Sequence, residues 1–158
     1  MIFTTQSYAD FVSLCKTVDA APKVAYFAYP AGQSYFMYGY LPTSGLLVQF
    51  LQGGVEEFPS FLTDFPDALS LNSTITIQGD KFLSFNNLAD YVTFLGAMPP
   101  GVAKIVFGVD ETTLEAYAVV GSLVVELMAS ISSVDFLIAF PTAVQLQSRA
   151  ECSADYTT

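Results

Sequence analysis

Two segments of the chain, residues 7–18 and 87–98, carry apolar side chains at the spacing of a single buried helical face. In both segments the apolar positions follow the order i, i+3, i+4, i+7 and i+10, which matches the helical period. The first stripe consists of Tyr8, Phe11, Val12, Cys15 and Val18, and the second of Leu88, Tyr91, Val92, Leu95 and Met98. The pattern predicts two similar amphipathic helices, far apart in the chain.

The same order of blocks continues downstream of the two helices. Residues 46–51 align with residues 123–128, and residues 61–68 align with residues 136–143. Blocks that recur in one order, with deletions only between them, indicate a supersecondary unit used twice. We therefore expect a tandem duplication with an internal pseudo-twofold axis. The expected divisions are a first repeat, a second repeat and a polar tail, together a single domain, over residues 1–72, 73–146 and 147–158.

Around the helices, short apolar and alternating runs predict strands. In each repeat one short strand precedes the helix and three strands follow it. The expected strands cover residues 2–4, 23–29, 34–40 and 46–51 in the first repeat, and 74–77, 82–85, 104–109, 114–120 and 123–128 in the second. Pro59 and Pro66 limit residues 56–69 to short helical turns. The expected fold class is α+β: a tandem βαβββ duplication with antiparallel sheets and two helices packed on one face.

Composition adds limits to this picture. The chain has 158 residues, of which 53% are hydrophobic. So much apolar surface indicates a subunit interface or a lined cavity beyond the core, or else a well-packed β-rich monomer. The longest nearly apolar run, residues 116–125, is too short to cross a bilayer. With no signal peptide, Cys15 expected to be buried and Cys152 in the tail, the expected location is the cytoplasm, with no membrane partner.

Charge and residue types exclude several kinds of chemistry. The chain has 15 acidic and 5 basic residues, a net charge of −10, and no histidine. A Ser-His-Asp or Cys-His arrangement is therefore excluded, and zinc lacks its commonest nitrogen ligand. The densest acidic group, Glu56, Glu57, Asp64 and Asp67, is interpreted as a solvated face rather than a cation site. We expect a protein that is not an enzyme and that has no catalytic residues, no cofactor and no metal.

Tyrosines gather in the first predicted hairpin. They are Tyr26, Tyr29, Tyr35, Tyr38 and Tyr40. The corresponding hairpin of the second repeat carries only Phe107 and Tyr117 as aromatic residues. Because two copies of one unit need similar cores, the extra tyrosines indicate a ligand-binding wall or an interface. The alternative is a half-buried strand with tyrosines at its rim, which β-propensity alone explains.

The segment Lys81–Val92 is a short strand that runs directly into an apolar-striped helix, and residues 1–12 repeat this arrangement. A strand-helix-strand-strand-strand unit used twice resembles a sliding-clamp (DNA polymerase processivity factor) domain. The resemblance implies a ring-shaped homo-oligomer whose helices face double-stranded DNA with basic side chains. The residues placed for that role are Lys16, Lys23, Lys81 and Lys104.

The order of elements is also similar to the vicinal-oxygen-chelate (glyoxalase and bleomycin-resistance) family, whose paired modules curl around a cavity. That resemblance implies a binding protein for a small apolar or aromatic ligand, with the tyrosine-rich hairpin as the cavity wall. A third alternative, indicated by hydrophobicity and low catalytic content, is a structural subunit of a viral or other particle. The sequence thus predicts a non-catalytic, oligomeric binding or assembly protein and leaves these three forms open.

Overall fold

The computed structural model describes residues 2–18, 25–41, 46–54, 56–79, 82–97, 105–120 and 123–148. The chain divides into two compact units, residues 1–74 (unit 1) and residues 75–158 (unit 2). The division lies close to the predicted end of the first repeat at residue 72. Both units are α+β, as expected. Most of the predicted polar tail lies outside the described residues.

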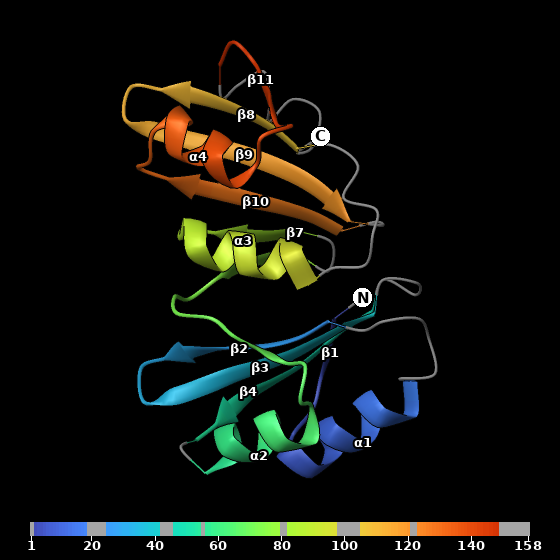
Figure 1. The fold of residues 1–158 in the computed structure, drawn as a ribbon. Helices are drawn as coiled ribbons and strands as arrows, with labels where there is room; N and C mark the ends of the chain where they lie inside the picture. Colours follow the sequence, from blue (N-terminus) through green and yellow to red (C-terminus); the bar gives the residue numbers. More distant parts are fainter. Residues whose placement is uncertain are drawn as a thin grey trace. The chain divides into compact units, whose positions relative to one another are not determined.

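Unit 1 is a five-stranded sheet with two helices (Figure 1). Its elements are β1 (Ile2–Thr4), α1 (Tyr8–Val18), β2 (Ala25–Ala31), β3 (Ser34–Leu41), β4 (Leu46–Gly53), α2 (Glu57–Asp64) and β5 (Leu69–Ser70). The strand order is β1-β4-β3-β2-β5. The central strands β2, β3 and β4 are antiparallel, whereas β1 pairs parallel with β4 and β5 parallel with β2.

Unit 2 repeats this order of elements and adds one edge strand. Its elements are β6 (Thr76–Gly79), β7 (Phe82–Phe85), α3 (Leu88–Ala97), β8 (Ile105–Asp110), β9 (Thr113–Val120), β10 (Leu123–Ala129), α4 (Ser133–Ala139) and β11 (Val144–Gln145). The strand order is β11-β8-β9-β10-β7-β6. Without β6, this is the strand order of unit 1, with the same parallel pairs at both ends.

The two units agree in register as well as in strand order. Thr4 pairs with Gln49 in unit 1, and Ser84 pairs with Glu126 at the same point of unit 2. The next strand in each sheet places Tyr38 opposite Gln49 and Tyr117 opposite Glu126. The hairpin turns match too, because Gly32 (φ 65°) and Glu111 (φ 55°) both adopt a left-handed backbone.

Local sequence signals explain the helix starts. Ser7 Oγ accepts a hydrogen bond from the Asp10 backbone N–H at 3.2 Å, and Asn87 Oδ1 accepts one from the Asp90 N–H at 3.2 Å. Each side chain thereby satisfies one of the donors that a helix leaves unpaired in its first turn. Ser7 and Asn87 are therefore equivalent N-caps, so residues of α1 and α3 at the same distance from them correspond to one another.

Two features of the predicted fold class are wrong. The sheets are mixed rather than antiparallel, and the described residues form four helices rather than two. α2 forms despite Pro59, which lies in its first turn, where the backbone N–H has no helical acceptor to lose. Pro66 follows the end of α2 and restricts nothing within it. Both units therefore contain the element order βαβββαβ, with short strands β5 and β11 that the sequence did not reveal.

The segment after the last helix has the same backbone in both units. Phe65 has φ −130° and ψ 82°, and Phe140 has φ −131° and ψ 79°. The N–H of Ala68 donates to the Phe65 carbonyl at 2.9 Å, and the N–H of Ala143 donates to the Phe140 carbonyl at 3.1 Å. The Phe-Pro connection is thus one structural motif used twice. None of the helices in the described ranges is long and apolar enough to span a membrane.

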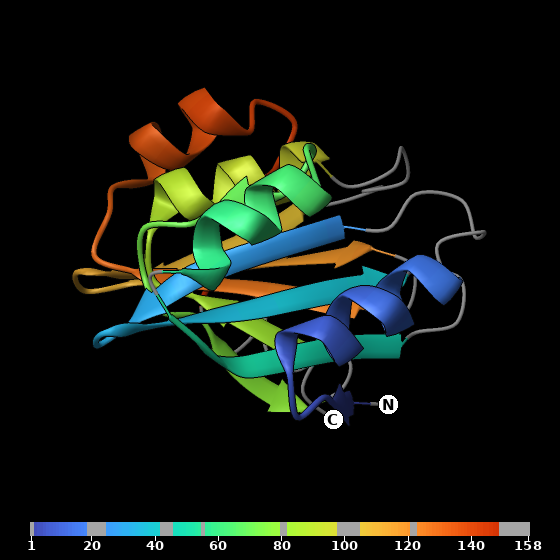
Figure 2. The same ribbon diagram turned by 90° about the horizontal axis from the view of Figure 1, so that it is seen from below.

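Both helices of unit 1 cover the same face of its sheet (Figure 2). The buried residues between helices and sheet are Phe11, Cys15, Ala28, Met37, Val48, Phe50, Phe61 and Phe65. The prediction that Cys15 is buried is confirmed. In unit 2 the ring of Phe85 on the sheet contacts that of Tyr91 on α3, and the ring of Phe107 contacts that of Phe136 on α4. Among the described residues, no helix lies on the opposite face of the sheet of its own unit.

We expect Gly53→Ala to destabilise the protein by about 1–3 kcal/mol because a Cβ there overpacks the sheet. That atom would lie 2.7 Å from Met37 Cε and 2.9 Å from the Tyr35 carbonyl oxygen. The matched control is Gly96→Ala. A Cβ at this position meets nothing within 4 Å, and the substitution removes a glycine from the last turn of α3. It should stabilise by up to about 1 kcal/mol. Urea unfolding measures both, and midpoints that shift in the same direction would contradict the packing.

Candidate functional site

Of the four lysines predicted to face DNA, the structure describes one. Lys16 lies exposed in the last turn of α1, with Nζ 5.9 Å from the centroid of the Phe65 ring. This is a cation–π contact within unit 1. Lys23, Lys81 and Lys104 lie outside the described residues. The nucleic-acid face stays a prediction.

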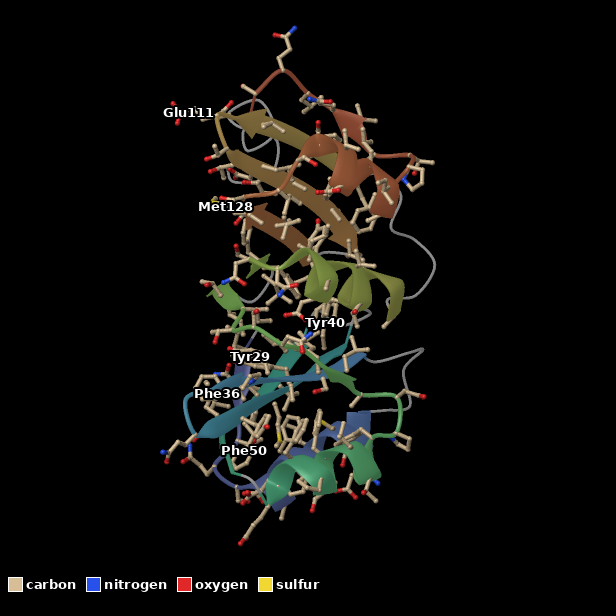
Figure 3. The ribbon with its side chains drawn as sticks, turned by 60° about the vertical axis from the view of Figure 1, so that its left-hand side comes forward. Tyr29, Phe36, Tyr40, Phe50, Glu111 and Met128 are labelled. Atoms are coloured by element: carbon tan, nitrogen blue, oxygen red, sulfur yellow. The ribbon has the colours of Figure 1, made fainter. Side chains whose placement is uncertain are left out.

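The tyrosines of the first hairpin divide between the two faces of the unit 1 sheet. Tyr35 lies on the helix-covered face, where its ring stacks on Phe58 with centroids 4.1 Å apart. Tyr35 has the same parity as Met37 along β3, which also faces the helices, whereas Tyr38 and Tyr40 have the opposite parity. Tyr29 and Tyr40 lie on the opposite face, as Figure 3 shows by contrast with Phe50. Tyr26 belongs to β2, but its side chain is outside the described part of the structure.

Tyr29 and Tyr38 bind each other on that helix-free face. Their rings stack with centroids 5.6 Å apart and an interplanar angle of 14°, and their hydroxyl oxygens lie 3.0 Å apart. Phe27 continues the stack from the other side of Tyr38 at 5.0 Å. Burial raises the pKa of both Tyr29 and Tyr38 above the ordinary tyrosine value. These side chains already use their polar atoms within unit 1, and a role as a ligand wall stays a prediction.

The acidic residues around α2 have separate structural roles. Glu57 Oε2 accepts a hydrogen bond from the Gly54 backbone N–H at 2.8 Å, and Asp64 Oδ2 accepts one from the Tyr8 hydroxyl at 2.5 Å. Glu56 and Asp67 are exposed. Among the described residues no three metal-ligating side chains come together. Glu57 and Asp64 therefore form hydrogen bonds within unit 1, whereas the sequence interpretation treated them only as part of a solvated face.

A buried acidic cluster lies on the helix-free face of the unit 2 sheet. Glu115 and Glu126 are 6% and 4% exposed, and Tyr117, between them, is fully buried. The Tyr117 hydroxyl donates to Glu126 Oε2 at 2.7 Å and also contacts Glu115 Oε1. Ser84 Oγ donates to Glu126 Oε1 at 2.6 Å. In unit 1 the equivalent position of Glu126 is the neutral Gln49, which donates to Thr4 at 2.7 Å.

The geometry of this cluster favours a protonated carboxyl group at Glu126. Tyr117 has one hydroxyl proton but contacts two carboxyl groups, so the second contact is satisfied when a carboxyl group is itself protonated. Burial raises the pKa of Glu126, and the neighbouring Glu115 raises it further, against the opposing hydrogen bonds from Ser84 and Tyr117. The cluster can hold and release a proton near the middle of the sheet.

The second candidate site is a groove between α3 and α4, which we call the α3–α4 groove. Its volume is about 370 Å³. Its lining residues are Val92, Leu95, Gly96, Ile105, Ala139, Phe140 and Thr142. The lining side chains are apolar apart from that of Thr142, and Phe140 is one of them.

Unit 1 fills the equivalent space with its own side chains. Counting from the equivalent caps Ser7 and Asn87, Lys16 corresponds to Gly96. Phe65 corresponds to Phe140 by backbone geometry, and Phe65, beneath Lys16, is only 4% exposed. Phe140 is only partly buried. Gly96 of the α3–α4 groove thus has no side chain at the position where unit 1 has Lys16.

The helix α4 next to this groove exposes apolar side chains. Val134 is 65% exposed and Ile138 is 74% exposed, and their i, i+4 spacing puts them on one side of the helix. On α3, Val92 is 37% exposed. The corresponding residues of α2 are Pro59 and Thr63, so unit 1 has no such aliphatic stripe.

The sequence contained weak signals for both sites. The aligned blocks show Asp64 replaced by Ala139, which is a change from a polar to an apolar lining. Glu115 and Glu126 stand at the two ends of an apolar run, but only the pairing of β9 with β10 brings them to one tyrosine. Gly96 lines the groove and leaves open space where another residue would have a Cβ, and no sequence motif predicts such a space.

We expect Glu126→Gln to change how stability depends on pH. A carboxyl group with a raised folded-state pKa stabilises the fold below its ordinary value of 4.5, and this contribution is lost as pH rises through the folded-state pKa. The variant should therefore gain unfolding free energy relative to wild type as pH rises above 4.5, by about 1.4 kcal/mol per unit of pKa shift.

Urea unfolding at a series of pH values measures this difference. Glu111→Gln is the control, since Glu111 is exposed at the β8–β9 turn (Figure 3) and its substitution should leave the pH dependence unchanged. A constant difference between Glu126→Gln and wild type across the pH range would contradict the protonated carboxyl group.

No family model, no curated protein and no solved structure matches the chain.

Proposed function

We propose that the protein is a non-catalytic binding protein that docks a partner polypeptide on unit 2, along α4 and in the α3–α4 groove. The observation that carries the proposal is the exposure of Val134 and Ile138 on α4, the helix whose Ala139 lines the α3–α4 groove. Clustered apolar surface of this kind is typical of protein interaction sites. Covering one such aliphatic side chain contributes about 1.5–3 kcal/mol.

The partner is a segment of another protein that combines apolar and basic residues. The net charge of −10 favours a basic partner and speeds its association. A segment that lies along α4 would place apolar side chains on Val134 and Ile138. This mode of binding needs no catalytic group, in keeping with a chain that has no histidine.

The earlier hypotheses have less support from the residues described. In the clamp-type ring, Lys16 would have to leave Phe65 to reach double-stranded DNA. In the small-ligand hypothesis, Tyr29 and Tyr38 would have to exchange their mutual hydrogen bond for a ligand. The role as a particle subunit and the homo-oligomer stay proposals. No contact among the described residues supports either of them.

We also infer that the two units descend from one duplicated unit. The shared strand order and register, the equivalent caps Ser7 and Asn87, and the equal dihedral angles of Phe65 and Phe140 support this inference. After such a duplication, unit 2 was free to lose the lysine of unit 1 and to expose α4. The internal pseudo-twofold axis stays a prediction.

A displayed library of random 12-residue peptides tests the docking proposal. Selection on the full chain should enrich peptides with both apolar and basic residues. The double variant Val134→Ser/Ile138→Ser should bind them at least tenfold more weakly in a titration by isothermal calorimetry. The matched control is Leu62→Ser on α2 of unit 1, which removes a 38% exposed leucine and should leave binding unchanged.

Three outcomes would overturn the proposal. One is the enrichment of no peptide, and another is equal binding by the double variant. The third is self-association, measured by analytical ultracentrifugation, that disappears in the double variant, because a second copy of the chain would then be the occupant.

A further inference from the structure

We propose that the α3–α4 groove is a binding site for the side chain of a partner lysine, whose ammonium group lies over the Phe140 ring. This inference gives the chemistry of one anchor in the docking site proposed above, and it rests on that proposal for the existence of a partner. The groove is formed by residues of this chain, so its existence does not depend on a partner.

Unit 1 supplies the template for the occupant. There the aliphatic part of Lys16 extends from the last turn of α1, and its Nζ lies 5.9 Å from the centroid of the Phe65 ring. The unit 2 counterparts, Gly96 and Phe140, both line the α3–α4 groove. A Cβ built on Gly96 meets nothing within 4 Å, so the first carbon of such a side chain has open space in unit 2.

The groove matches a lysine in shape and in electrostatics. Val92, Leu95 and Ala139 offer apolar contacts to a four-carbon stem, and a phenylalanine face attracts a cation. The C-terminal end of a helix carries a partial negative charge that favours a cation nearby. α1 has Lys16 in its last turn, whereas α3 has no basic residue in its last turn. A lysine from a partner would supply the charge that unit 2 lacks at this position.

A series of variants at Gly96 tests the groove within the chain. Lysine, methionine, glutamine and glutamate have similar helix propensities, so differences among them report the groove. Gly96→Lys should raise the thermal unfolding midpoint by about 2 °C more than Gly96→Met does, and Gly96→Glu should rank lowest. Equal midpoints for Gly96→Lys and Gly96→Met would overturn the cation preference.

A small probe tests binding from outside. N-acetyl-lysine amide, titrated at millimolar concentrations and followed by NMR, should shift the amide signals of Val92, Gly96 and Phe140. N-acetyl-norleucine amide, which keeps the apolar stem without the charge, should bind at least tenfold more weakly. Equal shifts with both probes would make this an apolar groove and overturn the proposal.

Two substitutions exchange the roles of the units. Gly96→Lys should abolish the shifts caused by the lysine probe. Lys16→Gly should open the equivalent space in unit 1 and add a second set of shifts around Phe65. Because both variants are read in the folded full chain, the outcome does not depend on finding the partner.

The chain's own Lys104 is the remaining competitor, since it directly precedes the groove residue Ile105 in the sequence. The titration is therefore repeated with Lys104→Ala. Unchanged affinity supports a lysine from a partner, whereas affinity at least tenfold higher means that Lys104 occupies the groove and overturns the proposal. Loss of peptide docking with intact lysine binding would reject the proposed function alone, and the reverse would reject only the lysine anchor.

Discussion

The register of the parallel strand pair in each unit determines which side chains face the helices. β1 pairs with β4 in unit 1, and β7 pairs with β10 in unit 2 at equivalent residues. A shift of one residue would turn every side chain of the strand to the other face. With the observed register, Val48 and Val125 face the helices, and Gln49 and Glu126 face away from them. Core and candidate sites both follow from this alternation.

A constant backbone with changed side chains explains the difference in chemistry between the units. At one position of the helix-free face, Gln49 of unit 1 is neutral and Glu126 of unit 2 is a buried acid. At one position of the helix layer, Lys16 covers a phenylalanine, whereas Gly96 leaves the equivalent ring accessible. At both positions the side chains differ while the strand order and register of the two units agree.

The sequence predicted most elements because periodicity and caps are local signals. The strands Ile2–Thr4 and Phe82–Phe85 have their predicted bounds, and both long helices lie within one residue of theirs. The sequence pattern does not predict α2 as a full helix because a proline ordinarily ends a helix, although Pro59 lies in the first turn, where it costs no hydrogen bond. The parallel pairing of β1 with β4 joins segments far apart in sequence, which residue patterns do not report.

The candidate sites were less predictable than the fold because each depends on space or on pairing across strands. The acidic cluster needs the β9–β10 register to bring Glu115 and Glu126 to one hydroxyl. The α3–α4 groove includes Gly96, a position without a side chain. An exposed apolar stripe such as Val134 and Ile138 brings a risk of self-association, which a net charge of −10 opposes through repulsion between copies. The same negative charge favours a basic partner. It therefore opposes self-association and also attracts a basic segment to the exposed apolar stripe.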